Sequence, residues 1–229
     1  MSGNNVAGAV RRADRSLLTW AYPEGAVCLT CGRASGGGIL CARCRKGLDD
    51  CALPQDDTAV WRYENEAGEL VRLLKERAVA PAAGALALGM AKKLADMGFP
   101  EDAVLTSVPM PETRRRQRGI DHGWELALAL SAITGLKARP LMRRKARNAR
   151  TQRGLGQEER RLNVRDAFVA LAPVPATVIL TDDVLTTGAT TGECARCLQE
   201  AGCERVILIT ACRAGLNLDN AQSAEATDA

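Results

Sequence analysis

Apolar residues follow two different spacings along the chain. Continuous apolar, β-branched runs predict buried parallel strands, which are Val104–Val108, Val178–Leu180 and Val206–Thr210, and a further short strand is expected at Ala59–Tyr63. Apolar residues every three or four positions predict helices at Glu66–Arg77, Ala82–Met97, Trp124–Thr134 and about 190–201. A helix between two such strands is a βαβ unit, so the pattern predicts an α/β fold in which helices flank a parallel sheet.

The two ends of the chain differ from this central part. Residues 6–20 predict one amphipathic helix within an N-terminal segment, 1–27, and a Cys- and Gly-rich module follows at 28–52. Proline and acidic residues at 53–57 interrupt both periods, so we expect the module boundary there and the main domain over 53–214. The polar, small residues 215–229 predict a disordered tail.

Length and composition fit one medium α/β domain with a small extra module. The chain has 229 residues, of which 46% are hydrophobic and 25% charged. No apolar run approaches the roughly 20 residues that cross a bilayer, and no signal-peptide pattern opens the chain. We therefore expect a cytoplasmic protein without membrane insertion.

Positive charge is concentrated in one stretch. Residues 112–165 hold 15 Lys and Arg against 5 Asp and Glu, although the whole chain carries only +4. Such a local excess suits a phosphate-rich ligand or nucleic acid, and an Arg-rich solvated surface explains it equally well. The aromatic content of 3% argues against a base-stacking platform for single strands.

Within that stretch, residues 139–161 show no regular apolar face and predict a mobile loop. We expect its clustered basic side chains to be exposed; they are Arg143, Arg144, Lys145, Arg147, Arg150 and Arg153.

Four cysteines have the spacing of a zinc site. Cys28-x2-Cys31 and Cys41-x2-Cys44 are separated by a Gly-rich turn, and four thiolates satisfy tetrahedral zinc completely. A redox dithiol is the alternative, but a catalytic Cys-x2-Cys would not need a second pair. We expect one structural zinc ion, because this short segment has little apolar area with which to fold alone.

The remaining candidate ligands have simpler interpretations. Cys51 lies outside the set, as half of another pair or a free thiol. Cys194 and Cys197 fall on one face of a predicted helix, where small buried hydrophobes are expected. His122 is the only histidine, and we interpret it as a surface or pocket side chain rather than a metal ligand.

A phosphate-binding loop follows the strand at Val178–Leu180. The strand ends in two acids, Asp182 and Asp183, and the loop residues that lead into the next helix are Thr186, Thr187, Gly188, Ala189 and Thr190. Glycine and small residues let backbone N–H groups converge on an anion at a helix N-terminus. The chain lacks the glycine patterns of nucleoside triphosphate and dinucleotide loops. The alternative is an ordinary helix N-cap, which needs only one Asp or Thr side chain. Two consecutive carboxylates exceed that need.

This segment resembles the phosphoribosyl-diphosphate motif of type I phosphoribosyltransferases, in which two hydrophobic residues and Thr-Thr-Gly-x-Thr follow an acidic pair. The resemblance implies the parallel-sheet fold of that class. It also implies that Asp182 and Asp183 accept hydrogen bonds from the ribose 2- and 3-hydroxyls, and that Thr186–Thr190 binds the 5-phosphate.

From about residue 28 to 213 the chain is similar to the ComF (competence protein F) family, which joins a zinc ribbon to such a domain. Val108-Pro109-Met110-Pro111 followed by Arg118-Gly119 resembles the family pattern, and Lys75 matches a family lysine. The resemblance assigns Pro109, Met110, Arg118 and Gly119 to the pyrophosphate loop, with magnesium between pyrophosphate and ribose oxygens. Asp121-His122 replaces the family's usual Asn-Gln, and the family's second cysteine pair is reduced to Cys51, which favours one zinc ion over two.

The sequence leaves two functions open. One is a phosphoribosyltransferase that binds phosphoribosyl diphosphate and uses an unknown acceptor. The other, implied by the ComF resemblance, is a non-catalytic adaptor in DNA uptake whose basic face meets single-stranded DNA or a helicase partner. The intact acidic pair favours the first, and the basic stretch favours the second.

Overall fold

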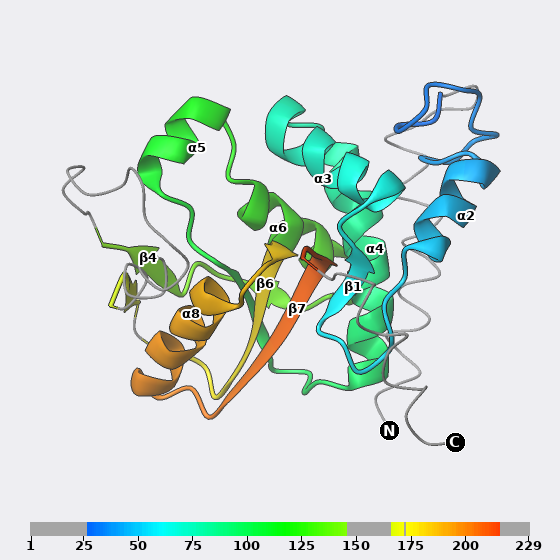
Figure 1. The fold of residues 1–229 in the computed structure, drawn as a ribbon. Coiled ribbons are helices and arrows are strands. Elements are labelled where there is room, and N and C mark those ends of the chain that lie inside the picture. Colours follow the sequence, from blue (N-terminus) through cyan, green and yellow to red (C-terminus); the bar gives the residue numbers. More distant parts are fainter. Residues whose placement is uncertain (1–26, 146–165, 172, 216–229) are drawn as a thin grey trace, which may run out of the picture.

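A computed structural model describes residues 27–145, 166–171 and 173–215 of the chain (Figure 1). The predicted N-terminal helix and the predicted tail from residue 216 lie outside the described residues. So do Arg147, Arg150 and Arg153 of the predicted mobile loop.

Five parallel strands form the main sheet in the order β1-β7-β6-β2-β3, which confirms the predicted fold class. The strands are β1 (Ala59–Arg62), β2 (Val104–Ser107), β3 (Lys137–Ala138), β6 (Thr177–Leu185) and β7 (Arg205–Arg213). Val178 of β6 pairs with Val104 of β2 on one side and with Val206 of β7 on the other. The strand that carries the acidic pair is therefore the centre of the sheet.

Helices cover both faces of this sheet (Figure 1). One face packs against α3 (Asn65–Arg77), α4 (Ala80–Met97) and α6 (His122–Thr134), and the other packs against α8 (Ala189–Glu200). Ile179 joins the first core with Leu74 and Leu126, whereas Leu180 joins the second with Leu198. Successive residues of β6 thus enter opposite cores, as the two-residue period of a strand requires.

A short antiparallel pair corrects the prediction that the arginine-rich stretch is irregular from residue 139 onward. Strand β4 (Met142–Arg144) pairs with β5 (Phe168–Ala170). Met142 and Phe168 are buried under α8, and the guanidinium of Arg144 lies 5.3 Å from the Phe168 ring centroid. A strand this short, whose partner is distant in sequence, leaves no periodicity to detect. Arg143 and Lys145 are exposed as expected, and Arg144 is half-buried.

Helix α5 (Glu112–Arg118) was also not expected, since it contains no apolar residue. Its first residue, Glu112, forms ion pairs with Arg115 at 2.9 Å and Arg116 at 3.2 Å, at the i, i+3 and i, i+4 spacings that support a helix. The helix ends at Gly119, which has a left-handed φ of 75°.

The cysteine module packs on the main domain. Cys41 is followed by helix α2 (Ala42–Asp50), which contains Cys44 and lies beside α3 (Figure 1). Leu40 and Leu48 of the module belong to the same core as Leu74 of α3. Backbone hydrogen bonds of 2.8 Å from Arg62 to Cys51 and of 2.9 Å from Leu53 to Val60 join the module to β1.

The segment expected as a linker is held to the sheet. Lys93, a buried lysine of α4, donates to the carbonyls of Pro54 and Ala59 at 2.7 Å. Asp57 accepts two hydrogen bonds from Arg213 at the end of β7. Among the described helices, none is long and apolar enough to cross a membrane.

Candidate functional site

The loop after β6 lies at the carboxyl edge of the sheet, where open parallel sheets bind ligands. Gly188 precedes the first residue of α8 with a left-handed φ of 75°, and the Thr191 hydroxyl donates to its carbonyl at 3.0 Å. Thr186 and Thr187 are exposed, whereas Gly188, Ala189 and Thr190 are half-buried. The turn therefore presents the N-terminus of a twelve-residue helix, beside two exposed threonines, to an anion, although the Ala189 N–H already donates to the Thr187 hydroxyl at 3.4 Å.

The two acids at the end of β6 face opposite sides of the sheet. Asp183 continues the row of Ile179 toward α3 and α6, and Asp182 continues the row of Leu180 toward α8. Asp182 is partly exposed, and its Oδ1 accepts a 2.9 Å hydrogen bond from the backbone N–H of Asp183. The side chain of Asp183 is only 7% exposed.

Two side chains from distant elements meet Asp183. Lys75 Nζ, from the last turn of α3, lies 3.0 Å from its Oδ1, and His122 Nε2, from the first turn of α6, lies 2.9 Å from its Oδ2. The same His122 nitrogen is 3.1 Å from Nη1 of Arg118 at the end of α5. The fold thus gathers one buried carboxylate, one lysine, one histidine and one arginine at this edge.

Burial shifts the pKa of Asp182 and the pKa of His122 in opposite directions. Burial, reinforced by the neighbouring charge of Asp183, raises the pKa of Asp182 to about 8. Burial also lowers the pKa of His122; Asp183 opposes this shift, while Lys75 and Arg118 add to it. His122 is therefore neutral at pH 7, and Asp182 holds its proton there.

The residues assigned to a pyrophosphate loop lie beside this acidic pair. Pro109 and Met110 follow β2, the neighbour of β6, and the Val108 N–H donates to the Thr181 carbonyl at 3.0 Å. Arg118 and Gly119 return the chain to the same edge, where Arg118 meets His122. Of the four residues assigned to this loop, Arg118 is thus linked to Asp183 through one side chain, that of His122.

Sequence reasoning missed the roles of two residues in this cluster. The sequence identified Lys75 only as a match to a family lysine at the end of a helix, and His122 only as a surface or pocket side chain. The neighbouring departure from the family pattern, Asp121, has a clear local role, because its side chain caps α6 by accepting from the Trp124 N–H at 3.1 Å. That cap places His122 in the first turn of α6, and an Asp followed by a helical pattern is the signal that could have placed it.

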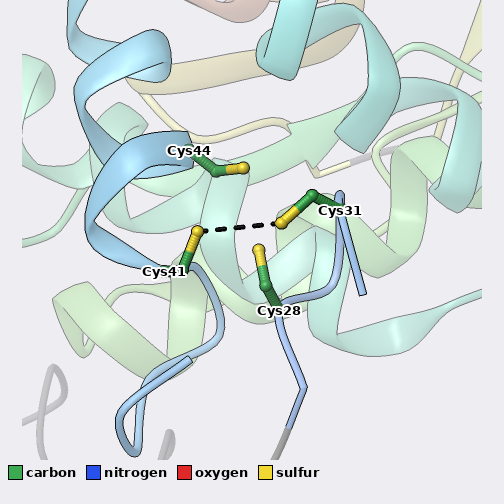
Figure 2. A group of neighbouring side chains, drawn as sticks. All are labelled: Cys28, Cys31, Cys41 and Cys44. Carbon is green, nitrogen blue, oxygen red and sulfur yellow. Dashed lines mark hydrogen bonds between the residues drawn. The ribbon is translucent and has the colours of Figure 1, made fainter. Parts of the chain in front are cut away.

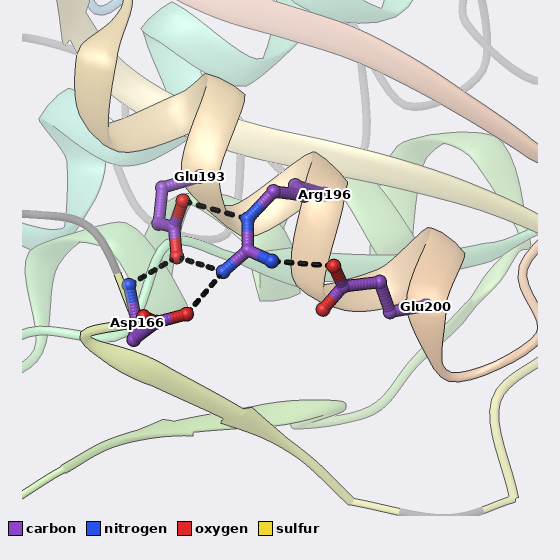
Figure 3. A network of polar contacts seen from close by, with 4 residues as sticks. All are labelled: Asp166, Glu193, Arg196 and Glu200. Carbon is purple, nitrogen blue, oxygen red and sulfur yellow. Dashed lines mark hydrogen bonds and ion pairs between the residues drawn. The ribbon is translucent and has the colours of Figure 1, made fainter.

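A second polar network joins α8 to the chain before β5 (Figure 3). The carboxylate of Glu193 accepts from Arg196 at 3.0 and 2.7 Å and from the backbone N–H of Asp166 at 2.6 Å. Arg196 also pairs with Asp166 at 2.7 Å and with Glu200. These contacts attach the start of β5 to the helix that carries the anion-binding turn.

The four cysteines of the predicted zinc site converge, as Figure 2 shows. All four sulfurs lie within 4.8 Å of one another, and those of Cys31 and Cys41 are 3.7 Å apart. Sulfurs that surround zinc tetrahedrally at about 2.3 Å are about 3.8 Å from each other, so this geometry fits the ion. Although burial opposes it, hydrogen bonds from Thr30 and from backbone N–H groups lower the pKa of Cys28 to about 6, which favours the thiolate.

The other described cysteines are buried thiols. Cys194 and Cys197 lie on the buried face of α8, which confirms the expectation for that pair, and burial raises the pKa of both. Cys51 is buried between the module and α3, where its thiol donates to the Glu64 carbonyl at 3.7 Å. It takes no part in the four-cysteine cluster.

Comparison with known proteins identifies two curated relatives. The chain is 31% identical over 125 residues to a protein named Competence protein F from Haemophilus influenzae, a match that covers 53% of this chain and only about half, 54%, of that protein. It is 26% identical over 187 residues to Competence protein ComFC from Bacillus subtilis, covering 78% of this chain and 73% of the relative. No family model matches the chain. The two relatives confirm the resemblance that the motifs indicate.

Solved structures give a partial likeness. An allosteric regulatory enzyme of purine biosynthesis matches with 24% identity and a TM-score of 0.39, over 56% of this chain and 26% of that one. The glutamine phosphoribosylpyrophosphate amidotransferase of B. subtilis, complexed with ADP and GMP, matches with 23% identity and a TM-score of 0.41, over 57% and 26%. Likeness at this level carries no inference about function.

Proposed function

Since the chain is a homologue of Competence protein F and of ComFC, we propose that it binds phosphoribosyl diphosphate at the carboxyl edge of its sheet. The observation that carries the proposal is the unit formed by the end of β6, the turn at Gly188 and the start of α8. It places the carboxyl group of Asp182, a residue of intermediate burial, and an anion-binding helix terminus on consecutive parts of one loop. Ribose 5-phosphate carries a 2,3-diol and a phosphate on one small molecule, so its binding needs an acceptor for the hydroxyls and an anion site close together.

Each part of the ligand has a proposed partner. The acidic pair, Asp182 and Asp183, would face the ribose, with Asp182 as the less buried member. The turn would hold the 5-phosphate through Thr186, Thr187, Gly188, Ala189 and Thr190. Pro109, Met110, Arg118 and Gly119 would line the pyrophosphate, to which Arg118 adds charge.

Magnesium would arrive with the ligand rather than occupy a cage of protein groups. Among the described residues, the only cluster of three or more potential metal-ligating side chains is the four-cysteine group. Magnesium prefers phosphate and water oxygens with one or two carboxylates. We propose Asp182, a residue of intermediate burial at this edge, as that carboxylate.

The reaction we propose is transfer of the phosphoribosyl group to an acceptor, with release of pyrophosphate, in a protein that serves DNA uptake. The protein's part would be to orient the donor and to stabilise the negative charge that develops on the departing pyrophosphate. We assign the stabilisation of that charge to Arg118, at the end of α5.

A thermal-shift titration tests the binding step. A ligand that binds only the folded chain raises its Tm in proportion to the logarithm of the ligand concentration above Kd. We expect phosphoribosyl diphosphate with magnesium to raise the Tm more than ribose 5-phosphate or pyrophosphate, since each of these fills only part of the site. Absence of any shift with the complete ligand would contradict the proposal. Release of pyrophosphate with a panel of nucleobases would then decide whether transfer occurs.

One observation favours an adaptor role as the second candidate. Helix α5 exposes Arg114, Arg115, Arg116 and Arg118 on a segment without any buried side chain, and Arg143 and Lys145 are exposed on and beside β4. Contact of such residues with single-stranded DNA would make binding fall with salt at a slope near −0.7 per phosphate neutralised. Replacement of Arg114, Arg115 and Arg116 by Gln should flatten that slope by roughly two units. Salt-independent or undetectable DNA binding by the wild type would remove this candidate.

The four-cysteine cluster would hold a structural zinc ion. Four sulfurs complete the preferred tetrahedron and leave no open position for substrate. We therefore propose a scaffolding role for the ion.

A further inference from the structure

His122 lies between two groups that require opposite hydrogen-bond roles from its ring. Its Nε2 is hydrogen-bonded to Nη1 of Arg118 at 3.1 Å and lies 2.9 Å from Oδ2 of Asp183. This Oδ2 is nevertheless buried without a hydrogen-bond partner among the described residues, and so is Nδ1 of the ring. A guanidinium can only donate and an ionised carboxylate can only accept, so one ring nitrogen cannot serve both at once.

The surroundings of His122 keep its ring neutral at pH 7. Burial lowers the pKa of His122, and the cations Lys75 and Arg118 lower it further. The acids Asp183 and Asp121 oppose this shift. A neutral ring carries one proton, so the hydrogen bond from Arg118 to Nε2 leaves that proton on Nδ1. The ring therefore accepts from Arg118 while the carboxylate beside it still lacks a donor.

Arg118 is the member of this arrangement that can leave. It is exposed at the end of α5, and no acidic side chain in the described part of the chain forms an ion pair with it. Arg115 and Arg116 of the same helix both pair with Glu112. A guanidinium forms stronger, bidentate hydrogen bonds with a phosphate group than the single bond that an imidazole accepts. A diphosphate at this edge would therefore draw Arg118 away from His122.

We propose that His122 is a positioning residue that links Arg118 to Asp183. In the free protein its Nε2 accepts from Arg118, and once an anion takes Arg118, the same nitrogen carries the proton and donates to Asp183 Oδ2. One proton leaves Nδ1 and one binds Nε2, through water, so the ring stays neutral and the proton count is unchanged. The identity of the anion, the pyrophosphate part of the ligand, rests on the proposed function, whereas the hold on Arg118 rests on the geometry of the side chains.

The link gives the two parts of the ligand a common protein partner. Asp183 is one of the two acids proposed to face the ribose, and Lys75 already lies 3.0 Å from its Oδ1. A donor from His122 to Oδ2 would fix the second oxygen as well, and a carboxylate oxygen can still accept a further hydrogen bond. The carboxylate would thus be oriented before the ribose hydroxyls reach it, which lowers the cost of ordering the site.

Nitrogen NMR of the ring tests the hold on Arg118 without any ligand. His122 is the only histidine of the chain, so in protein without a histidine tag the ring signals belong to it. At pH 7 we expect the Nδ1-protonated tautomer in the wild type and the Nε2-protonated tautomer in Arg118→Met, which lacks the donor. Arg114→Gln, a change at an exposed arginine of the same helix, should match the wild type. A proton on Nε2 in the wild type, or an unchanged tautomer in Arg118→Met, would overturn the hold.

The same spectra with saturating magnesium pyrophosphate test the release step. We expect the wild type to change to the Nε2-protonated tautomer that Arg118→Met shows without ligand. Backbone amide shifts of Met110 and Gly119 report whether pyrophosphate is bound. Bound pyrophosphate with an unchanged tautomer would overturn the step.

Two replacements of His122 separate positioning from packing. A Gln side chain carries its acceptor and its donor on different atoms, so His122→Gln can serve both neighbours, whereas His122→Phe fills space and serves neither. We expect folded His122→Gln to bind phosphoribosyl diphosphate with magnesium within about threefold of the wild type, and folded His122→Phe at least about fivefold more weakly, because a buried acceptor is left without a donor. Equal losses in the two variants would show that only the shape of the ring matters, and would overturn the proposal.

The outcomes also separate this inference from the proposed function. If pyrophosphate binds and phosphoribosyl diphosphate does not, the proposed function fails, and magnesium pyrophosphate becomes the probe for the His122 variants. If neither binds, the proposed function and the release step fail together, and the tautomers of the ligand-free proteins still decide whether His122 holds Arg118.

Discussion

At the scale of single residues, the protonation of Asp182 has the largest consequence for the site. Its pKa is raised to about 8 because the carboxyl group is buried beside a second acid. A neutral carboxyl group at pH 7 can donate one hydrogen bond, but it loses the charge that makes bonds from a diol strong. Two hydroxyl donors would favour the ionised form, so ligand binding should release a proton.

The same shift predicts how stability depends on pH. The folded pKa of Asp182 lies above its unfolded value of 3.8, so between about pH 4 and pH 8 the folded state holds a proton that the unfolded state has released. The stability of the folded state that depends on a protonated Asp182 is therefore fully present below about pH 4, and it is lost as the pH rises to 8. Asp182→Asn removes this loss, so the variant should be more stable than the wild type at pH 8 by at least about 1 kcal/mol and gain less at pH 5. Urea unfolding at the two pH values measures it.

The exposed Asp56 offers a matched control for that measurement. Asp56→Asn removes a carboxyl group of the same chemistry from the surface and should change stability by less than 0.5 kcal/mol, roughly, at both pH values. An equal gain for Asp182→Asn at pH 5 and pH 8 would contradict the raised pKa.

At the scale of elements, the turn into α8 depends on one glycine. Gly188 has a φ of 75°, and a Cβ there would meet only ordinary contacts at 3.9 Å, so Gly188→Ala should cost about 1–2 kcal/mol through the backbone alone. Gly192, four residues later in the same helix, has open space around it, and Gly192→Ala should stabilise the helix by about 0.5–1 kcal/mol. Urea unfolding of both variants gives the comparison. The reverse order of stability would show that the turn does not need its left-handed residue.

The elements also show which parts of the fold could be predicted from the sequence. The long helices and the central strands have strong periodicity, and the βαβ unit around Gly188 follows from local residues alone. Strand β6 was predicted only at Val178–Leu180, since the acids Asp182 and Asp183 look like loop residues until neighbouring strands enclose them. Helix α5 and strand β4 were missed because arginines dominate both, and no apolar period marks them.

The candidate site divides in the same way. Asp182 and the threonine turn lie within one continuous motif, so spacing and resemblance could locate them. Lys75 and His122 are 108 and 61 positions before Asp183 in the sequence, and only the packing of α3 and α6 on the sheet brings them to it. Sequence patterns describe neighbours along one element, and they do not describe which helix ends meet at a sheet edge.

At the scale of the whole molecule, the cysteine module and the main domain share one core. Leu40 and Leu48 pack in the cluster that contains Leu74 of α3, and a hairpin contact joins Cys51 to β1. The module lies beside α3 and α4 (Figure 1). Loss of the metal should therefore destabilise the main domain as well as residues 28–52.

Calorimetric unfolding with and without a zinc chelator tests that coupling. We expect Cys28→Ser to lose about one equivalent of zinc and to lower the Tm of a single main transition, because metal binding is linked to folding of the shared core. Asn65, beside Cys51, is not a ligand, and Asn65→Ala should retain the metal. Full zinc content in Cys28→Ser would rule out the ligand set, and an unchanged main transition would show that the module unfolds independently.

The central claim is that Asp182 and the turn at Gly188 form a site for phosphoribosyl diphosphate. Isothermal titration of the wild type and of Asp182→Asn with this ligand and magnesium, at pH 7 in two buffers of different ionisation enthalpy, tests it most directly. The account predicts binding by the wild type with release of close to one proton. It also predicts an affinity lower by at least about tenfold, and without that proton release, in the variant, because a charge-assisted hydrogen bond contributes about 1.5–3 kcal/mol. Equal affinity of the wild type and a folded Asp182→Asn variant would contradict the account.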